Sequence, residues 1–485
     1  MNDITLDQSA QEFEQLLNRA VKLIINTYSN LEDNKVFQKK SPQEIAACFD
    51  QTLPELPENT NALWEQVERD IVGNATFSAG PHFYSYVLSP GNQAGLAGEM
   101  ISSFLNQNAS KWHLGPAASE IEKVVLRWIA QFIGYEHYQT GLLVSGGSMA
   151  NLTCLTVARN QKASVSLNHQ GLYGQDPMMI YLTDQAHYCV DKAVGILGLG
   201  RNQIRRIVTD GDYRMRMDVL EETIKGDLKQ GLRPFCVVGS AGTVNSGAID
   251  PLKEIALICQ KYDLWFHVDA AYGGPAAGLE ELQHQFEGME QADSLALDPH
   301  KWLYVPIEAG CSLFKHPQAQ RNTFSMVPEY LKVDRSVDTS RTDFMEYGAQ
   351  LTRSSRSLKV WMTFKAYGAQ RLRENIRHDI HKTQYLESLV RDNPDFEVLT
   401  PAVLSIVCFR LNPREANLNP AELEDLNTRL IHGLEAHGGV FVTGTLVHGK
   451  TALRVCIINH RTQMRHVDHL WSIVSQVAQG LLLET

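Results

Sequence analysis

Short apolar runs alternate with helix-length segments through the middle of this chain, and this alternation restricts the fold more than any other feature. The runs occupy residues 141–144, 178–182, 235–238, 264–268 and 294–297. Strands that are buried on both faces read as continuous apolar runs, and helical connections are typical of parallel neighbours. The sequence therefore predicts an α/β domain with a mainly parallel sheet.

The chain has 485 residues, which is more than one hydrophobic core usually organises. Residues 1–90 read as helices, because helix-capping patterns at Ser9 and Ser41 precede apolar residues at helical spacing. Residues 91–365 hold the predicted sheet, and residues 366–485 mix helices with strand-like runs, including 439–442, as in a smaller α+β domain. The polar stretch 318–350 predicts a long mobile loop. The apolar-faced N-terminal helices need a surface to cover, such as a second subunit.

Charge and cysteine spacing exclude several classes of partner. The net charge is -11, and lysine and arginine are spread along the chain, so we do not expect nucleic-acid binding. The 8 cysteines form no close pair, no CxxC and no metal-ligand spacing with histidine, which predicts reduced thiols and no metal site. The N-terminus has no signal-peptide pattern and no apolar run approaches membrane-spanning length, so we expect a cytoplasmic protein without a membrane anchor.

Polar residues follow each of the apolar runs, at the edge where an open α/β sheet binds its ligand. They occupy residues 145–148, 184–187, 240–243, 269–272 and 298–301. The Ser-Gly-Gly-Ser turn at 145–148 opens a helix, so its free amides and the helix dipole favour a phosphate. An ordinary tight turn remains the alternative for this segment.

Three side chains at these strand ends suit a pyridine cofactor. Asp269 emerges from a dry strand, where a protonated ring nitrogen, a structural salt bridge or a helix cap would satisfy its carboxylate. Lys301 follows another dry run, which should lower its pKa as an imine-forming amine requires, although most lysines are surface residues. His187 can stack on a ring or be a satisfied core histidine. Together with the phosphate turn, these residues predict pyridoxal 5'-phosphate held on Lys301.

Three motifs resemble the group II pyridoxal-dependent amino acid decarboxylases, and among these the aromatic-L-amino-acid decarboxylases. The motifs are SGGSMANL at 145–152, HVDAAYGG at 267–274 and DPHKWL at 298–303, with weaker support from RSLKVW at 356–361. The resemblance covers most of the chain. It implies a fold type I homodimer whose active site lies at the subunit interface, with an N-terminal helical arm that wraps its partner.

The same resemblance implies roles for individual residues. Lys301 would form the Schiff base with the cofactor, Asp269 would pair with the pyridinium nitrogen, and His187 would stack on the ring. Further residues would contact the opposite ring face, the phosphate or the cofactor's surroundings: Ala271, Gly147, Ser148, Thr243 and His300.

Residues 324–332 look like the family's catalytic loop and align Tyr330 with the catalytic tyrosine. That tyrosine would protonate the substrate carbon after carbon dioxide leaves. In related plant enzymes a phenylalanine at this position diverts the reaction to oxidative deamination and an aldehyde. Tyr330 therefore favours simple decarboxylation, and a solvated loop tyrosine is the alternative.

Substrate choice depends on a few positions. Residues 353–359 look more like the aromatic and histidine decarboxylases than the glutamate or cysteine sulfinate enzymes, and Tyr86 falls where aromatic decarboxylases line the substrate pocket. Asn108 and Ser110 stand where the animal aromatic enzymes carry bulky apolar residues that reach into the partner's site. Asp298 replaces an asparagine common in animal members, and its charge argues against a phosphate contact.

These observations predict decarboxylation of an aromatic or imidazole L-amino acid to its amine and carbon dioxide. One alternative is a decarboxylase of a short polar amino acid, namely aspartate, glutamate, cysteine sulfinate or 2,4-diaminobutyrate. Another is a different pyridoxal phosphate lyase, such as an aldehyde synthase. A non-catalytic homologue with a disused pocket is the third, and the intact set of Lys301, Asp269, His187 and Tyr330 argues against it.

Overall fold

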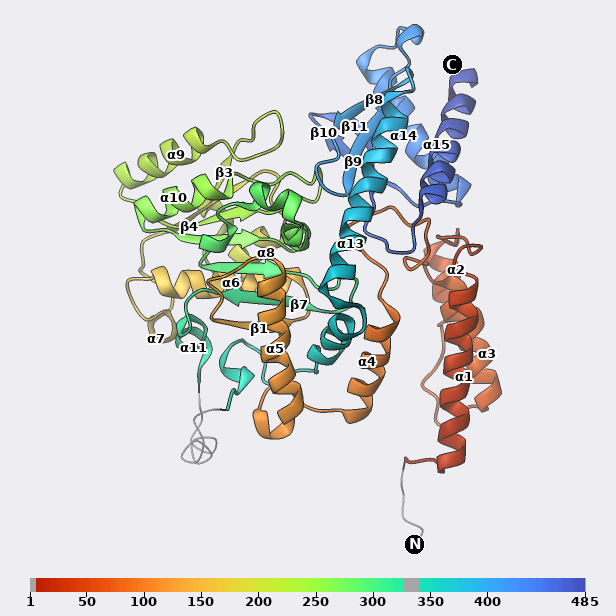
Figure 1. Ribbon diagram of the computed structural model, residues 1–485, viewed down its shortest axis with the longest axis horizontal. Coiled ribbons are helices and arrows are strands. Elements are labelled where there is room, and N and C mark those ends of the chain that lie inside the picture. Colours follow the sequence, from red (N-terminus) through yellow and green to blue (C-terminus); the bar gives the residue numbers. More distant parts are fainter. Residues whose placement is uncertain (1–5, 327–340, 485) are drawn as a thin grey trace.

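A seven-stranded sheet forms the centre of the computed structural model, which describes residues 6–326 and 341–484 (Figure 1). The strands lie in the order β1-β7-β6-β5-β4-β2-β3. Strand β7 pairs antiparallel with β1 and β6, and the remaining neighbours pair in parallel. The strand bounds are β1 (Thr140–Val144), β2 (Met178–Thr183), β3 (Ile204–Ile207), β4 (Arg233–Ser240), β5 (Trp265–Asp269), β6 (Ser294–Leu297) and β7 (Gly310–Phe314). The predicted α/β class and mainly parallel sheet are confirmed.

Two strands of this sheet, β3 and β7, are absent from the predicted runs. Strand β3 is a partly buried edge strand with arginines at its centre, so it shows no apolar run. Strand β7 begins at Gly310, where an added Cβ would lie 2.5 Å from the Cα of Gly146. This close approach requires glycine at the first position of the strand, so the run of apolar residues in β7 is too short to be recognised in the sequence.

Helices cover both faces of the sheet. Successive side chains of strand β2 point to opposite faces of the sheet. Ile180 packs with the cluster around α6 (Gly147–Lys162) and α8 (Cys189–Ile196), and Tyr181 packs on the opposite face. The opposite face carries α5 (Pro116–Phe132), α9 (Met217–Lys229) and α10 (Leu252–Tyr262). Helix α4 (Gln93–Leu105) and the short helix α7 (Leu167–Gln170) also belong to this part. Within residues 6–326 and 341–484, no helix is long and apolar enough to cross a membrane.

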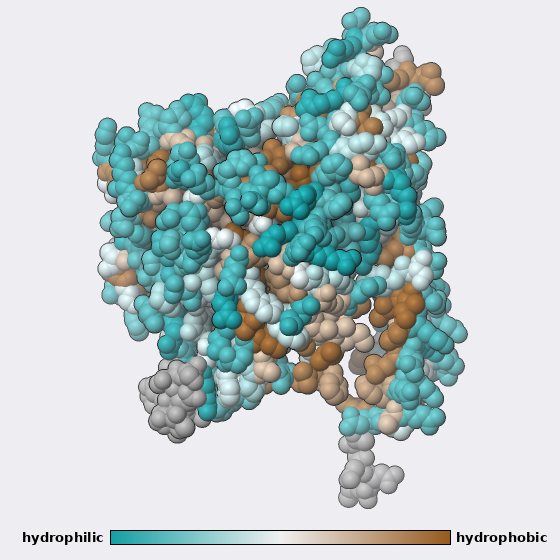
Figure 2. All heavy atoms as spheres, in the orientation of Figure 1, coloured by the Kyte–Doolittle hydropathy of each residue, from teal (hydrophilic) through white to brown (hydrophobic). Residues whose placement is uncertain are grey.

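The N-terminal helices stand beside the rest of the molecule as an arm (Figure 1). They are α1 (Ala10–Ser29), α2 (Pro42–Ala47) and α3 (Thr60–Gln66). The capping boxes predicted at Ser9 and Ser41 are both present. None of the residues in these helices is buried within the chain. Figure 2 shows hydrophobic side chains along the inner edge of the arm.

The C-terminal part has its own antiparallel sheet in the order β10-β11-β9-β8. Long helix α13 (Ser357–Arg391) leads into it and leaves helical geometry at Gly368, where φ is 71°. Its other elements are β8 (Phe396–Thr400), β9 (Ile406–Leu411), α14 (Pro420–His437), β10 (Thr443–Val447), β11 (Lys450–Cys456) and α15 (Met464–Glu484). The run at 439–442 was expected to be strand-like, but β10 starts at Thr443. Phe441 instead makes an isolated bridge to Phe83.

The stretch 318–350 differs from the predicted continuous loop at both of its ends. Residues Ala319–Phe324 form helix α11, and Phe344–Glu346 form a short 3-10 turn. Arg321 and Glu346 join these two ends through an ion pair of 2.7 Å between Nη2 and Oε2. Because an ion pair holds these two ends together, they are ordered although their sequence shows no apolar periodicity. Tyr330 belongs to the part between them that lies outside the described residues.

A buried ion pair fixes the end of β1 just before the phosphate turn. Nη2 of Arg353 lies 2.5 Å from Oε1 of Glu122, and both side chains are buried. The same carboxylate oxygen accepts from the amide of Leu143 at 2.9 Å, and Arg353 donates to the carbonyl of Leu143 at 2.8 Å. A second guanidinium nitrogen donates to the carbonyl of Ala109. Helix α5, strand β1 and the segment before α13 are therefore held at one point.

Replacing Glu122 with leucine should lower the free energy of unfolding by about 3–5 kcal/mol, because it leaves the buried Arg353 cation without its carboxylate. The matched control is Glu120→Leu on the same helix, where an exposed pair with Lys123 is lost and a change below about 1 kcal/mol is expected. Urea unfolding curves of the two variants measure this difference. Equal shifts in both midpoints would contradict the role given to the buried pair.

Candidate active site

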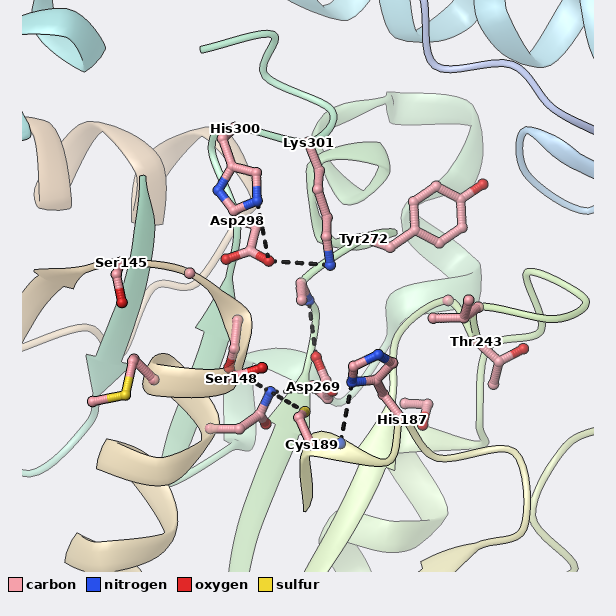
Figure 3. Close-up of a pocket in the computed structure, with 18 of the residues that line it drawn as sticks. Ser145, Ser148, His187, Cys189, Thr243, Asp269, Tyr272, Asp298, His300 and Lys301 are labelled. Carbon is pink, nitrogen blue, oxygen red and sulfur yellow. Dashed lines mark hydrogen bonds and ion pairs between the residues drawn. The ribbon is translucent and has the colours of Figure 1, made fainter. Parts of the chain in front are cut away.

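A cavity of about 370 Å³ opens where strands β1, β2, β4, β5 and β6 end (Figure 3). Every residue that the sequence nominates for the cofactor lines this cavity: Gly147, Ser148, His187, Thr243, Asp269, Ala271, His300 and Lys301. They come from separate loops, each following a strand of the sheet. The sheet thus brings together side chains that are up to 154 residues apart, from Gly147 to Lys301 (301 − 147).

The phosphate turn lies at the N-terminus of α6, which begins at Gly147. Amides of a first helical turn have no carbonyl partner within their own helix, so those of Gly147 and Ser148 are suited to an anion. A Cβ added at Gly147 would lie 2.7 Å from Oδ2 of Asp298 and 3.3 Å from Cβ of Ala271. Only glycine fits this position.

Asp269 ends strand β5, and both of its carboxylate oxygens are oriented by the chain (Figure 3). Oδ1 accepts from the amide of Ala271 at 3.1 Å, and Oδ2 accepts from Nδ2 of Asn151 at 3.2 Å. Each oxygen keeps acceptor capacity on the cavity side, because a carboxylate oxygen can accept more than one hydrogen bond. A protonated ring nitrogen would complete the set.

Lys301 lies beside a second carboxylate. Its Nζ is 3.1 Å from Oδ2 of Asp298, which itself is buried after strand β6 (Figure 3). Burial lowers the pKa of Lys301, but Asp298 and Asp269 raise it, and the resulting pKa lies above the ordinary value. The predicted lowering of the pKa of Lys301 is therefore wrong, because sequence reasoning counted the dry strand and not the two anions beside it.

The two histidines of the cavity are oriented by backbone groups. Nδ1 of His187 accepts from the amide of Cys189 at 3.3 Å, and burial lowers the pKa of His187 although Asp269 opposes this. A neutral ring with the proton on Nε2 satisfies both observations. Nδ1 of His300 lies 2.7 Å from the carbonyl of Ala309 and donates to it, so Nε2 is left on the side of Asp298.

Thr243 has its hydroxyl 2.9 Å from that of Ser246 and accepts from the amide of Ala248 at 3.2 Å. Outside the strand ends that the sequence singled out, the cavity also contains Met149, Asn151, Cys189 and Val244. Asn151 could have been found, because it lies one helical turn after Gly147 within the SGGSMANL motif.

The residues nominated for the substrate pocket lie apart from the cavity lining. Tyr86 is 59% exposed, with its ring 6.2 Å from that of Phe441. Asn108 uses its side chain within the chain, since Oδ1 accepts from the amides of Ser110 and Arg353 and Nδ2 donates to the carbonyl of Leu351. Ser110 is buried beside it.

Arg454 on strand β11 connects Tyr86 to the cavity. Nη1 donates to the carbonyl of Tyr86 at 3.1 Å, and Nε donates to the carbonyl of Val244, a cavity residue, at 2.7 Å. Its remaining nitrogen, Nη2, is buried and has no hydrogen-bond partner among the described residues. A buried cationic donor of this kind is costly unless an anion or acceptor meets it. Sequence reasoning missed Arg454 because it reads as one residue of a strand.

The donor set of the cavity fits pyridoxal 5'-phosphate. The amides of Gly147 and Ser148 match its phosphate, the carboxylate of Asp269 matches its ring nitrogen, and the amine of Lys301 matches its aldehyde carbon. The glycine at position 147 leaves the space that a Cβ would fill. The cavity volume lies within the range of small-molecule sites.

Comparisons with known proteins agree with this geometry. The family described as "Pyridoxal-dependent decarboxylase conserved domain" matches residues 42–412. An aromatic-L-amino-acid decarboxylase of Bacillus atrophaeus is 35% identical over 474 residues, which cover 98% of this chain and 97% of that protein.

Solved structures show the same fold over the whole chain. The structure of Oryza sativa TDC with PLP and tryptamine has a TM-score of 0.93 and 28% identity, covering 99% of this chain and 100% of that one. Mouse CSAD in its apo form has a TM-score of 0.90 and 26% identity, covering 96% and 99%. The expected fold type I architecture is thereby confirmed. The chain belongs to the pyridoxal-dependent decarboxylase family, and pyridoxal 5'-phosphate is its cofactor.

Proposed function

We propose that this carboxy-lyase removes the α-carboxyl group of an aromatic L-amino acid as carbon dioxide and releases the corresponding amine. The observation that carries the proposal is the convergence of Lys301, Asp269 and the phosphate turn in one cavity, which Arg454 links to the backbone of Tyr86. Its aromatic substrate class is supported by relatives that bear aromatic-L-amino-acid, tryptophan and tyrosine decarboxylase names.

Bound pyridoxal phosphate supplies an electron-poor ring that accepts the electron pair left when carbon dioxide departs. Lys301 would hold the cofactor through Nζ. Asp269 keeps the ring nitrogen protonated, so that the ring stays electron-poor. His187, neutral and oriented by the amide of Cys189, would pack on one face of the ring, and Ala271 on the other.

Phosphate binding and proton return complete the assignment. Gly147 and Ser148 bind the phosphate through their amides, with Thr243 and His300 at the rim of the cofactor site. Tyr330 returns a proton to the α-carbon that has lost its carboxyl group, which makes the product an amine. This role rests on the position of Tyr330 in the sequence, because the residue lies outside the described part of the chain.

An aromatic side chain fits the surroundings of Tyr86. The ring of Phe441 lies 5.5 Å from Phe83 and 5.6 Å from Phe37, in addition to its contact with Tyr86. Aromatic rings at such separations stabilise one another and would accept a further ring. Arg454 would bind the substrate carboxylate with its free Nη2, since its other contacts place it between Tyr86 and the cavity.

The residue types of Asn108 and Ser110 suggest a polar substrate, but their contacts in the structure weaken this argument. All hydrogen-bonding atoms of the Asn108 side chain are used within its own chain. A side chain bonded in this way offers a substrate few polar groups. We assign both residues to the edge of the partner's site in a dimer.

A homodimer with a shared active site is part of the proposal. Four apolar side chains along α1 are between 38% and 57% exposed: Phe13, Leu17, Val21 and Ile25. A row of exposed apolar residues on an arm that stands off the body is suited to burial against a second subunit. The cysteines are all free thiols, in keeping with a cytoplasmic location.

The direct test of the function is carbon dioxide release, with identification of the product, from a panel of L-amino acids. We expect amine formation from tyrosine, dihydroxyphenylalanine, tryptophan, phenylalanine or histidine, and no product with a Lys301→Ala control. Product only from aspartate, glutamate, cysteine sulfinate or 2,4-diaminobutyrate would overturn the aromatic assignment. Carbon dioxide release by Lys301→Ala at the rate of the unmodified protein would overturn the catalytic site.

Replacing Tyr330 with phenylalanine should lower amine formation by at least about tenfold, because a general acid is lost. With oxygen present, the variant should instead form an aldehyde, ammonia and hydrogen peroxide along with carbon dioxide. Product analysis and an oxygen electrode measure both effects. The matched control is Tyr173→Phe, an exposed tyrosine outside the cavity, which should behave as the unmodified protein. Unchanged amine formation by Tyr330→Phe would rule out its catalytic role.

Leu17→Glu should raise the dissociation constant of the homodimer by at least about tenfold, because a charge replaces an apolar side chain that dimerisation buries. Activity should fall with the loss of dimer, since the site is shared. Gln15→Glu, which adds the same charge elsewhere on α1, is the control. Sedimentation velocity over a concentration series gives both constants. An unaltered dimer of Leu17→Glu would show that this face of α1 is not the interface.

A further inference from the structure

An unbroken series of hydrogen bonds runs from Asp269 into the core, away from the cavity. Nδ2 of Asn151 donates to Oδ2 of Asp269 at 3.2 Å, and Oδ1 of Asn151 lies 2.7 Å from Nε2 of His267. Nδ1 of His267 lies 2.9 Å from the hydroxyl of Ser294, and Nε1 of Trp265 donates to that hydroxyl at 2.8 Å. None of these four partners is needed to contact the substrate.

The donors and acceptors of this series can be assigned from chemistry. Nδ2 of Asn151 faces the carboxylate of Asp269, the carbonyl of Gly147 at 2.9 Å and the sulfur of Cys189 at 3.6 Å, and the two oxygen acceptors fix the orientation of the amide. Its Oδ1 can only accept, so Nε2 of His267 must carry the proton. A neutral His267 then accepts at Nδ1 from the hydroxyl of Ser294. Every proton in the series points toward Asp269.

The surroundings keep this pattern in place. Asn151, His267 and Ser294 are fully buried, and His267 and Ser294 are neighbours in the register of β5 and β6. Burial lowers the pKa of His267 to about 4, even though Asp269 raises it, so the ring is neutral at physiological pH. A neutral ring can keep one bare nitrogen for Ser294 and one N–H for Asn151. The carbonyl of Ser294 lies 3.2 Å from the same Nδ1, so it is the amide of Asn151 at Nε2 that selects this tautomer.

We propose that Asn151, His267 and Ser294 are positioning residues that orient the carboxylate of Asp269 toward the ring nitrogen of the cofactor. Aligned donors polarise one another, so a series that ends on a carboxylate stabilises its negative charge more than a single amide does. Asp269 is also fixed in rotation, because Oδ1 is held by the amide of Ala271. The proposal rests on the cofactor site and is independent of the choice of substrate.

His267→Phe is the main test variant, because it fills the same core space while removing the donor to Asn151. The amide of Asn151 is then free to turn its oxygen toward Asp269, which would repel the carboxylate. His267→Gln can donate and accept in place of the imidazole, so it is the conservative rescue. His82→Phe makes the same substitution at a buried histidine of the α15 contact, outside the cavity, and is the control.

The readout is cofactor binding by the apoprotein, measured with pyridoxal phosphate and with its carbocyclic analogue, in which a C–H replaces the ring nitrogen. For His267→Phe, we expect the dissociation constant of pyridoxal phosphate to rise about tenfold, the size of a lost charge-assisted hydrogen bond. The analogue has no ring nitrogen to bind Asp269, so its affinity should stay within about twofold of the unmodified protein. His267→Gln and His82→Phe should bind both compounds normally.

Three outcomes decide the proposal. A loss of affinity for pyridoxal phosphate alone supports the proposal. An equal loss for both compounds would show that the series contributes only core packing, and this would overturn the proposal. Unchanged binding of both compounds would also overturn it. If His267→Phe does not fold, Ser294→Ala removes only a hydroxyl and should weaken pyridoxal phosphate selectively by about threefold. Decarboxylation by the unmodified protein is measured separately, so failure here leaves the proposed function standing.

Discussion

Buried charge at the carboxyl edge of the large sheet is the constraint on which the site depends. Asp269, Asp298 and Lys301 lie within one cavity, and a carboxylate in such a place is unstable unless donors meet it. The chain supplies them through the amide of Ala271, the side chain of Asn151 and the amine of Lys301. The carboxylate of Asp269 keeps acceptor capacity on the cavity side, where the ring nitrogen of the cofactor belongs. The protein residues alone therefore make the cavity specific for a ring with a protonated nitrogen.

Groups farther from the cavity hold this arrangement rigid. The pair of Glu122 and Arg353 ties β1 to α5 and to the segment before α13, so the phosphate turn starts from a fixed point. A second buried pair, Asp379 with Lys382, receives hydrogen bonds from Trp302 and Tyr304, directly after Lys301. Lys382 also donates to carbonyls at Asn459 and Thr462 in the C-terminal part. Both ends of the cofactor site are anchored by ionic contacts in the core.

The sequence predicts the sheet and the cofactor residues because both depend on local patterns. Each cofactor residue lies directly after an apolar run or within a short motif, so its place in the fold follows from the strand order alone. Strands β3 and β7 carry no such run, since one is a polar edge and the other packs a glycine against Gly146. The pKa of Lys301 depends on Asp298, three residues earlier in the same motif, and on Asp269, and the sequence pattern does not say whether these anions outweigh burial. The free nitrogen of Arg454 depends on partners far away in the chain, which no local pattern contains. Tyr86, Asn108 and Tyr330 remain predictions for the same reason, because a dimer and the residues between 326 and 341 would decide their roles.

Borohydride reduction of the purified protein with pyridoxal phosphate, followed by peptide mass spectrometry, tests the central claim most directly. The reduction fixes the cofactor permanently to the amine that holds it. The account predicts the label on the peptide that contains Lys301, and its loss when Asp269 is replaced by alanine and the cofactor is washed out before reduction. Labelling of another lysine in place of Lys301, or a protein that binds no cofactor, would contradict the account.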